Sequence, residues 1–181
     1  NFGIRNGSTI TLIGDPMNTR FNVTAYNRVK ADLAVLSETF KYSTDLSATR
    51  VPVDAVLEIA GDLESMKLNY KIELPESSED IRQKVNSLIN TDEQRIRQFA
   101  YLVTAGNFIS SMGTTNSNFG TNMFTSVATS ALTKGLDALF AGSLSDNWSV
   151  NTNMETMNGD FNTVRMGVDI ATSLLDNRLR I

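Results

Sequence analysis

The stretch from Arg50 to Pro75 alternates apolar and polar side chains over two segments separated by one turn. Successive side chains of a strand point to opposite faces, so this pattern predicts a two-stranded ribbon with one apolar and one charged face. The apolar positions are Val51, Val53, Ala55, Leu57, Ile59, Leu68, Tyr70, Ile72 and Leu74, and the charged or amide positions are Asp54, Glu58, Lys67, Asn69, Lys71 and Glu73. We expect the charged face to be solvated and the apolar face to need a cover.

A second stretch, residues 8–26, repeats this design. Laid over the first stretch without a gap, Gly14, Asp15 and Asn22 fall on Gly61, Asp62 and Asn69. The match predicts two copies of a strand-turn-strand unit. If the apolar residues share one face, Leu12 opposes Phe21 and Ile59 opposes Leu68, which places the turns at Asp15–Asn18 and Asp62–Ser65. Between the units, Lys30–Leu36 is compatible with a strand or a short helix.

Helical periodicity begins after Pro75. Ser77 or Ser78 can cap a helix with Ile81, Val85, Leu88 and Ile89 on one side. Thr91 and Gln94 predict the start of a second helix that ends near Gly106. A third amphipathic segment covers residues 123–140.

The segment from Gln98 to Thr133 contains no charged residue. Surface helices normally carry charge on their outer side, so this segment is either mostly buried or faces a partner or lipid. One interpretation is a pair of helices packed on the sheet with a polar loop between them. The other is an interaction surface.

The last part of the chain returns to a strand pattern around Asn158 and Gly159. A two-residue turn would place the two apolar sets on opposite faces. We therefore expect a three-residue loop that pairs Met157 with Phe161, Met154 with Val164, Val150 with Val168 and Trp148 with Ile170. The whole pattern predicts an α+β fold that is predominantly β, with about three amphipathic helices between the strand blocks. We expect one domain over residues 1–181, cut from a longer protein, with β ribbons in 1–75, helices in 76–142 and a hairpin in 143–181.

Composition excludes several kinds of chemistry. The chain has no histidine, and it has no cysteine, so thiol catalysis, histidine-based triads and imidazole or thiolate metal sites are excluded. Its formal net charge of -4, without a clustered basic patch, argues against nucleic-acid binding. The acid pairs fit structural roles, with Asp15 and Asp62 in turns and Asp54 and Glu58 on the solvated face. We expect neither an enzyme nor a cofactor or metal site.

The function of the chain therefore depends on what covers the apolar face. Burying one Val, Leu, Ile or Phe side chain is worth about 1.5–3 kcal/mol, so a row of them left in water is untenable. Two arrangements satisfy this requirement. The chain's own helices cover the face, or repeated ribbons curl and shelter acyl chains.

Four segments, taken in order, resemble the C-terminal domain of the TamB family in its Bacteroidetes form. They are GSTITLIGDPMNTRFNVTA, RVPVDAVLEIAGDLESMKLNYKIELP, VNSLIN and RQFAYLVTAGNF. The resemblance implies a curved sheet with an apolar lining, the β-taco of the AsmA-like proteins. It also implies the periplasm of a Gram-negative bacterium, with the full-length protein anchored in the inner membrane.

The resemblance further implies partners and a site. The partners are a TamA-type outer-membrane barrel protein and either phospholipid or nascent outer-membrane protein. The groove lining would be Ile10, Leu12, Phe21, Val23, Val53, Leu57, Ile59, Leu68, Tyr70 and Ile72. The partner surface comes instead from the interaction-surface interpretation of the uncharged segment and consists of Phe108, Phe119, Met123 and Phe124. The first hypothesis is a module that shelters acyl chains or client strands for outer-membrane protein assembly or phospholipid transport. The alternative is a docking module whose apolar sheet is covered by its own helices.

Overall fold

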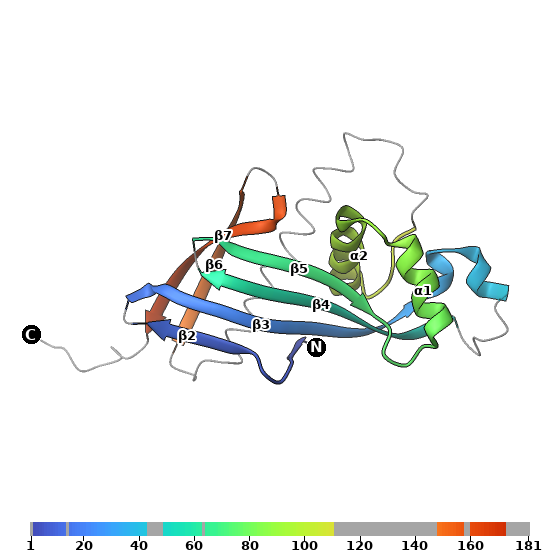
Figure 1. Cartoon of the computed structure of the whole chain (residues 1–181), viewed down its shortest axis with the longest axis horizontal. Helices are drawn as coiled ribbons and strands as arrows, with labels where there is room; N and C mark the ends of the chain where they lie inside the picture. The colour runs from blue at the N-terminus through green and yellow to red at the C-terminus, as the bar shows by residue number, and fades with distance from the viewer. Residues whose placement is uncertain are drawn as a thin grey trace, which may run out of the picture.

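A computed structural model describes residues 2–13, 15–42, 49–62, 64–110, 148–157 and 160–172. Its strands are β1 (Phe2–Ile4), β2 (Thr9–Ile13), β3 (Asp15–Asp32), β4 (Arg50–Asp62), β5 (Met66–Glu73), β6 (Trp148–Met157) and β7 (Asp160–Thr172). The helices are α1 (Glu79–Leu88) and α2 (Asp92–Ala105), with short 3₁₀ turns η1 (Leu33–Val35) and η2 (Glu38–Tyr42). The fold is predominantly β with two α-helices among the described residues (Figure 1). The expected third helix, 123–140, lies outside these residues.

All strand pairs are antiparallel and form one open, curved sheet in the order β1-β3-β4-β5-β7-β6. Strand β2 also pairs with β3, so β1 and β2 lie one after the other along the same edge of β3. The centre of the sheet is the long β3–β4 pairing, which runs from Arg20 opposite Asp62 to Asp32 opposite Arg50. The two sequence repeats are therefore neighbouring ribbons of one sheet.

The β4–β5 ribbon has the predicted register. Ile59 pairs with Leu68, and Gly61 pairs with Met66 across the turn. Gly61 has φ of 115°, a conformation that L-residues with a side chain rarely adopt. Asp62 Oδ1 accepts hydrogen bonds from the backbone N–H groups of Glu64 and Ser65 at 3.1 and 2.8 Å. These bonds confirm the turn role predicted for Asp62.

The predicted register of the β2–β3 ribbon is wrong by two residues. Ile10, rather than Leu12, pairs with Phe21, and Asp15–Asn18 belong to β3 instead of forming a turn. The ladder is irregular between Thr11 and Ile13, which pairs directly with Asp15. A β-bulge changes register without a signal in the hydrophobic pattern. Because the slip at this pair is two residues, Ile10 and Phe21 keep the face that alternation predicted.

The two helices begin and end as their sequences predict. At α2, the Thr91 hydroxyl accepts a hydrogen bond from the Gln94 N–H. The Gln94 side-chain oxygen in turn accepts one from the Thr91 N–H, which completes a capping box. Gly106 ends α2 with φ of 68°. Ser78 is the N-cap residue of α1 but makes no side-chain capping bond. Lys30–Leu36 contains both expected alternatives, since β3 ends at Asp32 and η1 follows.

The β6–β7 hairpin joins the sheet through a short contact. Strand β7 pairs with β5 only at Met66–Val164 and Lys67–Thr163, and Figure 1 shows the hairpin crossing the direction of β3–β5. The expected pairing of Met154 with Val164 and Val150 with Val168 is wrong, because Met154 pairs with Met166 and Val150 with Ile170. Next to the turn, Met157 pairs with Asp160. The register shifts between Met157 and Thr156, and Thr156 then pairs with Val164.

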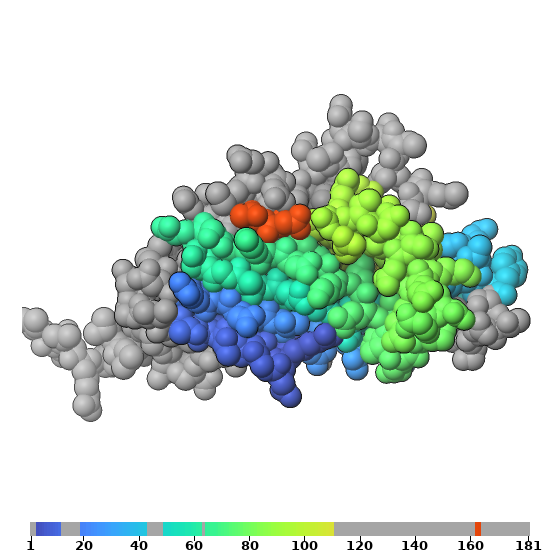
Figure 2. Space-filling view, viewed as in Figure 1, coloured from blue at the N-terminus to red at the C-terminus, as the bar shows by residue number. Residues whose placement is uncertain are grey.

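The main hydrophobic core lies between β3–β5 and the two helices. Its members from the two helices, with the residue that ends α1, are Ile81, Val85, Ile89, Ile96, Phe99, Ala100 and Leu102. Phe40 of η2 and Leu33 of η1 close one end of the core, at 1% and 0% exposure. Figure 2 shows α1 and α2 gathered over one end of the sheet, with β3–β5 reaching the surface beside them.

Candidate functional site

The register of β3, β4 and β5 gathers most of the predicted groove lining on one face, which we call the apolar face. It consists of odd-numbered residues of β3 and β4 and even-numbered residues of β5, aligned in rows such as Val23–Ile59–Leu68 and Ala25–Leu57–Tyr70. Phe21, Val23, Val53, Leu57, Ile59, Leu68 and Tyr70 are all buried, and Ile72 is half-buried. The predicted residues therefore form one contiguous surface.

Helix α2 lies against part of this face. The ring of Phe99 meets the ring of Tyr70 edge to face, with centroids 5.2 Å apart and an interplanar angle of 67°. Leu57, beside Tyr70 in the register, is 2% exposed, and Val53 is 0% exposed. Around Tyr70, the apolar face is thus an interior surface and not an open one.

The face continues to the outer edge of β3 with more exposure. Ile10 of β2 pairs with Phe21 and is 41% exposed, while Ile4 of β1 pairs with Ala25 and is 43% exposed. By the alternation of the sheet, both isoleucines belong to the apolar face. Leu12 lies in β2, but its side chain is not among those the structure describes. Among the described residues of the apolar face, the large apolar side chains that are exposed lie at the β1–β2 edge.

Of the predicted partner surface, the structure describes only Phe108, because Phe119, Met123 and Phe124 lie outside the described residues. Phe108 is buried in the core at 5% exposure. The backbone on either side is fixed by side-chain amides. Asn107 accepts the Asp32 N–H at 2.8 Å, and buried Gln98 bonds both the N–H and the C=O of Ile109, at 2.9 and 2.7 Å.

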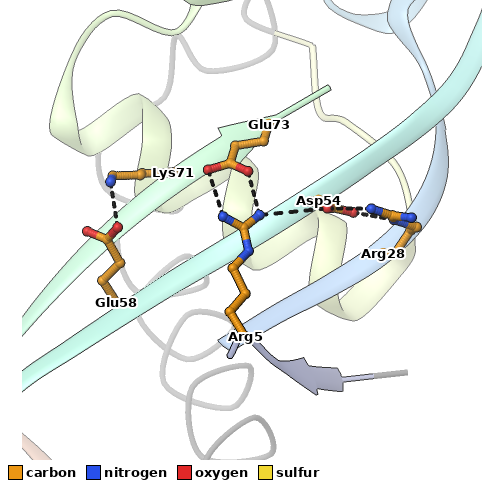
Figure 3. Close-up of polar contacts among 6 residues, drawn as sticks. All are labelled: Arg5, Arg28, Asp54, Glu58, Lys71 and Glu73. Carbon is orange, nitrogen blue, oxygen red and sulfur yellow. Dashed lines mark hydrogen bonds and ion pairs between the residues drawn. The ribbon is translucent and has the colours of Figure 1, made fainter. Parts of the chain in front are cut away.

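The opposite side of the sheet, which we call the ion-pair face, differs from the solvated surface that the sequence predicts. Asp54 is only 3% exposed, so its predicted solvation is wrong. Arg28 of β3, directly opposite Asp54 in the register, donates to both carboxylate oxygens at 2.6 and 2.8 Å (Figure 3). The hydrogen bond to Asp54 raises the pKa of Arg28. A buried carboxylate requires such a partner.

Arg5 is a member of this cluster that sequence analysis did not identify. It lies between β1 and β2, and its guanidinium donates to both oxygens of Glu73 on β5 (Figure 3). The Arg5 Nη2 atom is also 3.9 Å from the Asp54 carboxylate. Hydrogen bonding to Glu73 is the main cause of a raised pKa of Arg5. Nothing in the local sequence indicates a partner so distant along the chain.

A second ion pair lies farther along the same face. Glu58 of β4 accepts hydrogen bonds from Lys71 and Asn69 of β5, the latter at 2.7 Å. The Lys71 hydrogen bond is the main cause of a lowered pKa of Glu58. Arg5, Arg28 and Lys71 each stand beside a carboxylate on this face, so these charges are neutralised within the sheet.

The described residues also include a depression between the end of β5 and α1, with a volume of about 230 Å³. It is lined by Ile72, Glu73, Leu74, Pro75, Arg82 and Asn86. Its Glu73 carboxylate is already bound by Arg5, and Arg82 pairs with Glu79 at 2.9 Å. Across the part of the chain with assigned positions, no cluster of three or more acidic residues could hold a metal ion.

The fold and these two faces define a class: an open antiparallel β module with an ion-paired face and an apolar face packed by helices at one end. The sequence model of the TamB C-terminal domain matches residues 1–181, the whole chain. The chain therefore belongs to the TamB C-terminal domain family and is a module of a TamB-like envelope protein. Comparisons with curated proteins and with solved structures found no significant match. Neither described helix is long and apolar enough to span a membrane.

Proposed function

We propose that this chain is a docking module of a TamB-like protein, with its apolar sheet packed by its own helices. The observation that supports this proposal is the burial of the predicted groove lining, above all Tyr70 against Phe99. The module acts in the periplasm of a Gram-negative bacterium, with the full-length protein anchored in the inner membrane. Its partner is a TamA-type outer-membrane barrel protein. The absence of catalytic activity stays a prediction.

The energetics of the apolar face favour docking over storage. An acyl chain seated beside Leu57 and Tyr70 would have to displace Phe99 and neighbouring core residues of α2. Each large apolar side chain moved from the core into water costs about 1.5–3 kcal/mol. Displacing several would consume much of a typical stability of roughly 5–15 kcal/mol.

Pull-down of the purified chain with a detergent-solubilised TamA-type barrel tests docking. Phe119→Asp and Phe124→Asp place charge in the uncharged segment, and we expect both to weaken capture. Gln83→Glu is the matched control, since it adds the same charge at an exposed site on α1. Capture of both phenylalanine variants at the level of the control would contradict docking through this segment.

A second candidate function is favoured by the exposed edge. Ile4 and Ile10 extend the apolar face to solvent, which would suit acyl chains or client strands during phospholipid transport or outer-membrane protein assembly. Native mass spectrometry of the chain after exposure to phospholipid tests this idea. Retained lipid that is lost in Ile10→Asp but kept in Thr9→Asp would support it, because Thr9 lies on the same strand with the opposite alternation. Absence of retained lipid would leave docking as the sole proposal.

A further inference from the structure

The ion-pair face contains two like charges in direct opposition. Asp54 of β4 and Glu73 of β5 are register partners, and like charges placed across neighbouring strands are destabilising. Arg28 of β3 lies opposite Asp54 in the same row and forms an ion pair with it. Glu73 has no cation in that row, since on its other side β5 is paired with β7 only at Met66 and Lys67 among the described residues. Its cation is Arg5, from the far edge of the sheet.

Arg5 lies at the break between β1 and β2, where the chain stays bonded to β3. Thr24 of β3 is bonded from both sides of the break: its C=O accepts the Arg5 N–H at 2.9 Å, and its N–H donates to Ser8 Oγ at 3.0 Å. Gly7, between them, has φ of 89°. Ile4 belongs to the apolar face, so the alternation of the strand places the next side chain, that of Arg5, on the ion-pair face.

The course of the Arg5 side chain is marked by the residues beneath it. Its guanidinium carbon lies 5.8 Å from the centre of the Tyr26 ring. Tyr26 in turn lies against Gly3, where a Cβ atom would come within 2.7 Å of the ring. Val56, the register partner of Tyr26 on β4, is 0% exposed although it belongs to the ion-pair face. The arm of Arg5 therefore crosses β3 and β4 before it reaches Glu73 on β5 (Figure 3).

We propose that Arg5 is a strap that fastens the β1 edge to β5 across the ion-pair face, so that opening of this edge is coupled to Glu73. The strap supplies the cation that Glu73 lacks in its own row and holds β1 with more than its backbone bonds. Edge strands are the parts of sheets most prone to opening and to unintended pairing. A charged arm across the sheet restrains such an edge without lengthening the strand.

Hydrogen–deuterium exchange of the folded chain tests this coupling. In Glu73→Gln we expect exchange in the peptide covering residues 1–8 to accelerate about 3- to 10-fold, as for loss of a partly exposed ion pair that limits local opening. Glu58→Gln is the matched control, because it breaks the Lys71 pair on the same face. In the control, exchange of residues 1–8 should stay within about twofold of the wild type.

Two further measurements keep the test decisive. Adding Glu73→Gln to Arg5→Gln should give no further acceleration, since the strap is already lost. In the wild type, raising the salt concentration to about 0.5 M should accelerate exchange of residues 1–8 more than that of β4, because screening weakens an exposed pair. Equal effects of Glu73→Gln and Glu58→Gln on residues 1–8, or exchange there that does not respond to salt, would overturn the proposal.

Discussion

The rings of Tyr70 and Phe99 meet edge to face at 5.2 Å, which joins β5 to α2 through the centre of the apolar face. Both residues are almost fully buried, at 3% and 2% exposure. The contact shows that, at Tyr70, the apolar face is covered by a helix of the same chain. It also identifies the helix whose removal would expose the face.

Phe99→Ala should therefore destabilise the fold by about 3–5 kcal/mol, the usual cost of removing a buried aromatic side chain. Urea denaturation followed by circular dichroism measures the change in the free energy of unfolding. Thr104→Ala, on the exposed side of α2, is the control and should change that free energy by less than about 1 kcal/mol. A similar small change in Phe99→Ala would show that α2 does not stabilise the apolar face.

Asp54→Asn should destabilise the chain because two arginines lose their shared carboxylate. We expect a loss of about 1–3 kcal/mol, less than for a fully buried pair, since Arg28 is half exposed. Chemical denaturation measures the effect. Glu38→Gln breaks the exposed Lys41 pair and should cost less than about 0.5 kcal/mol. If the two variants were equally stable, Asp54 would be as solvated as the sequence alone suggested.

Gln98→Ala should release the backbone that follows α2. The Gln98 amide both donates to and accepts from Ile109, so truncation leaves two backbone groups without these bonds. The expected cost is about 1–3 kcal/mol, with faster exchange of the Ile109 amide. Gln83→Ala, at an exposed position of α1, serves as the control. Unchanged protection of the Ile109 amide would argue against this clamp.

Gly61→Ala should disrupt the β4–β5 turn more than Gly7→Ala disrupts the β1–β2 break. Both glycines have positive φ, and an alanine there costs roughly 1–2 kcal/mol from backbone strain. At Gly61 a Cβ atom would also lie 2.5 Å from the Ser65 carbonyl oxygen, whereas at Gly7 it meets nothing within 4 Å. Melting temperatures of the two variants give the comparison. Equal melting temperatures for the two variants would show that the Ser65 backbone moves aside at little cost.

Glu58 makes part of the stability depend on pH. Its pKa is lowered in the folded state by Lys71, so its contribution is present above the unfolded pKa and is lost as pH falls through the folded pKa. Asp62, whose pKa is lowered by hydrogen bonds from Ser65, acts in the same direction. Glu58→Gln should therefore flatten the fall in melting temperature below about pH 4.5. A parallel curve for wild type and variant would contradict this role.

Alternation and capping patterns predicted much of the local structure correctly. The two ribbons, the turn role of Asp62 and the capping box at Thr91 depend on residues close in sequence, so the chain's periodicity is enough to define them. Registers were less predictable. A slip of two residues at Ile10–Phe21 leaves both of these side chains on their expected face, and the hydrophobic pattern therefore cannot detect it.

The amino-acid pattern alone shows which residues share a face, since the side-chain period of a strand is a local property of the backbone. What covers each face is visible only in the three-dimensional arrangement of the chain. The burial of Asp54 depends on Arg28 from another strand, and the partner of Glu73 is Arg5, 68 residues away. The cover of Tyr70 comes from a separate helix. Contacts of this kind arise from the packing of distant elements, which no local periodicity encodes.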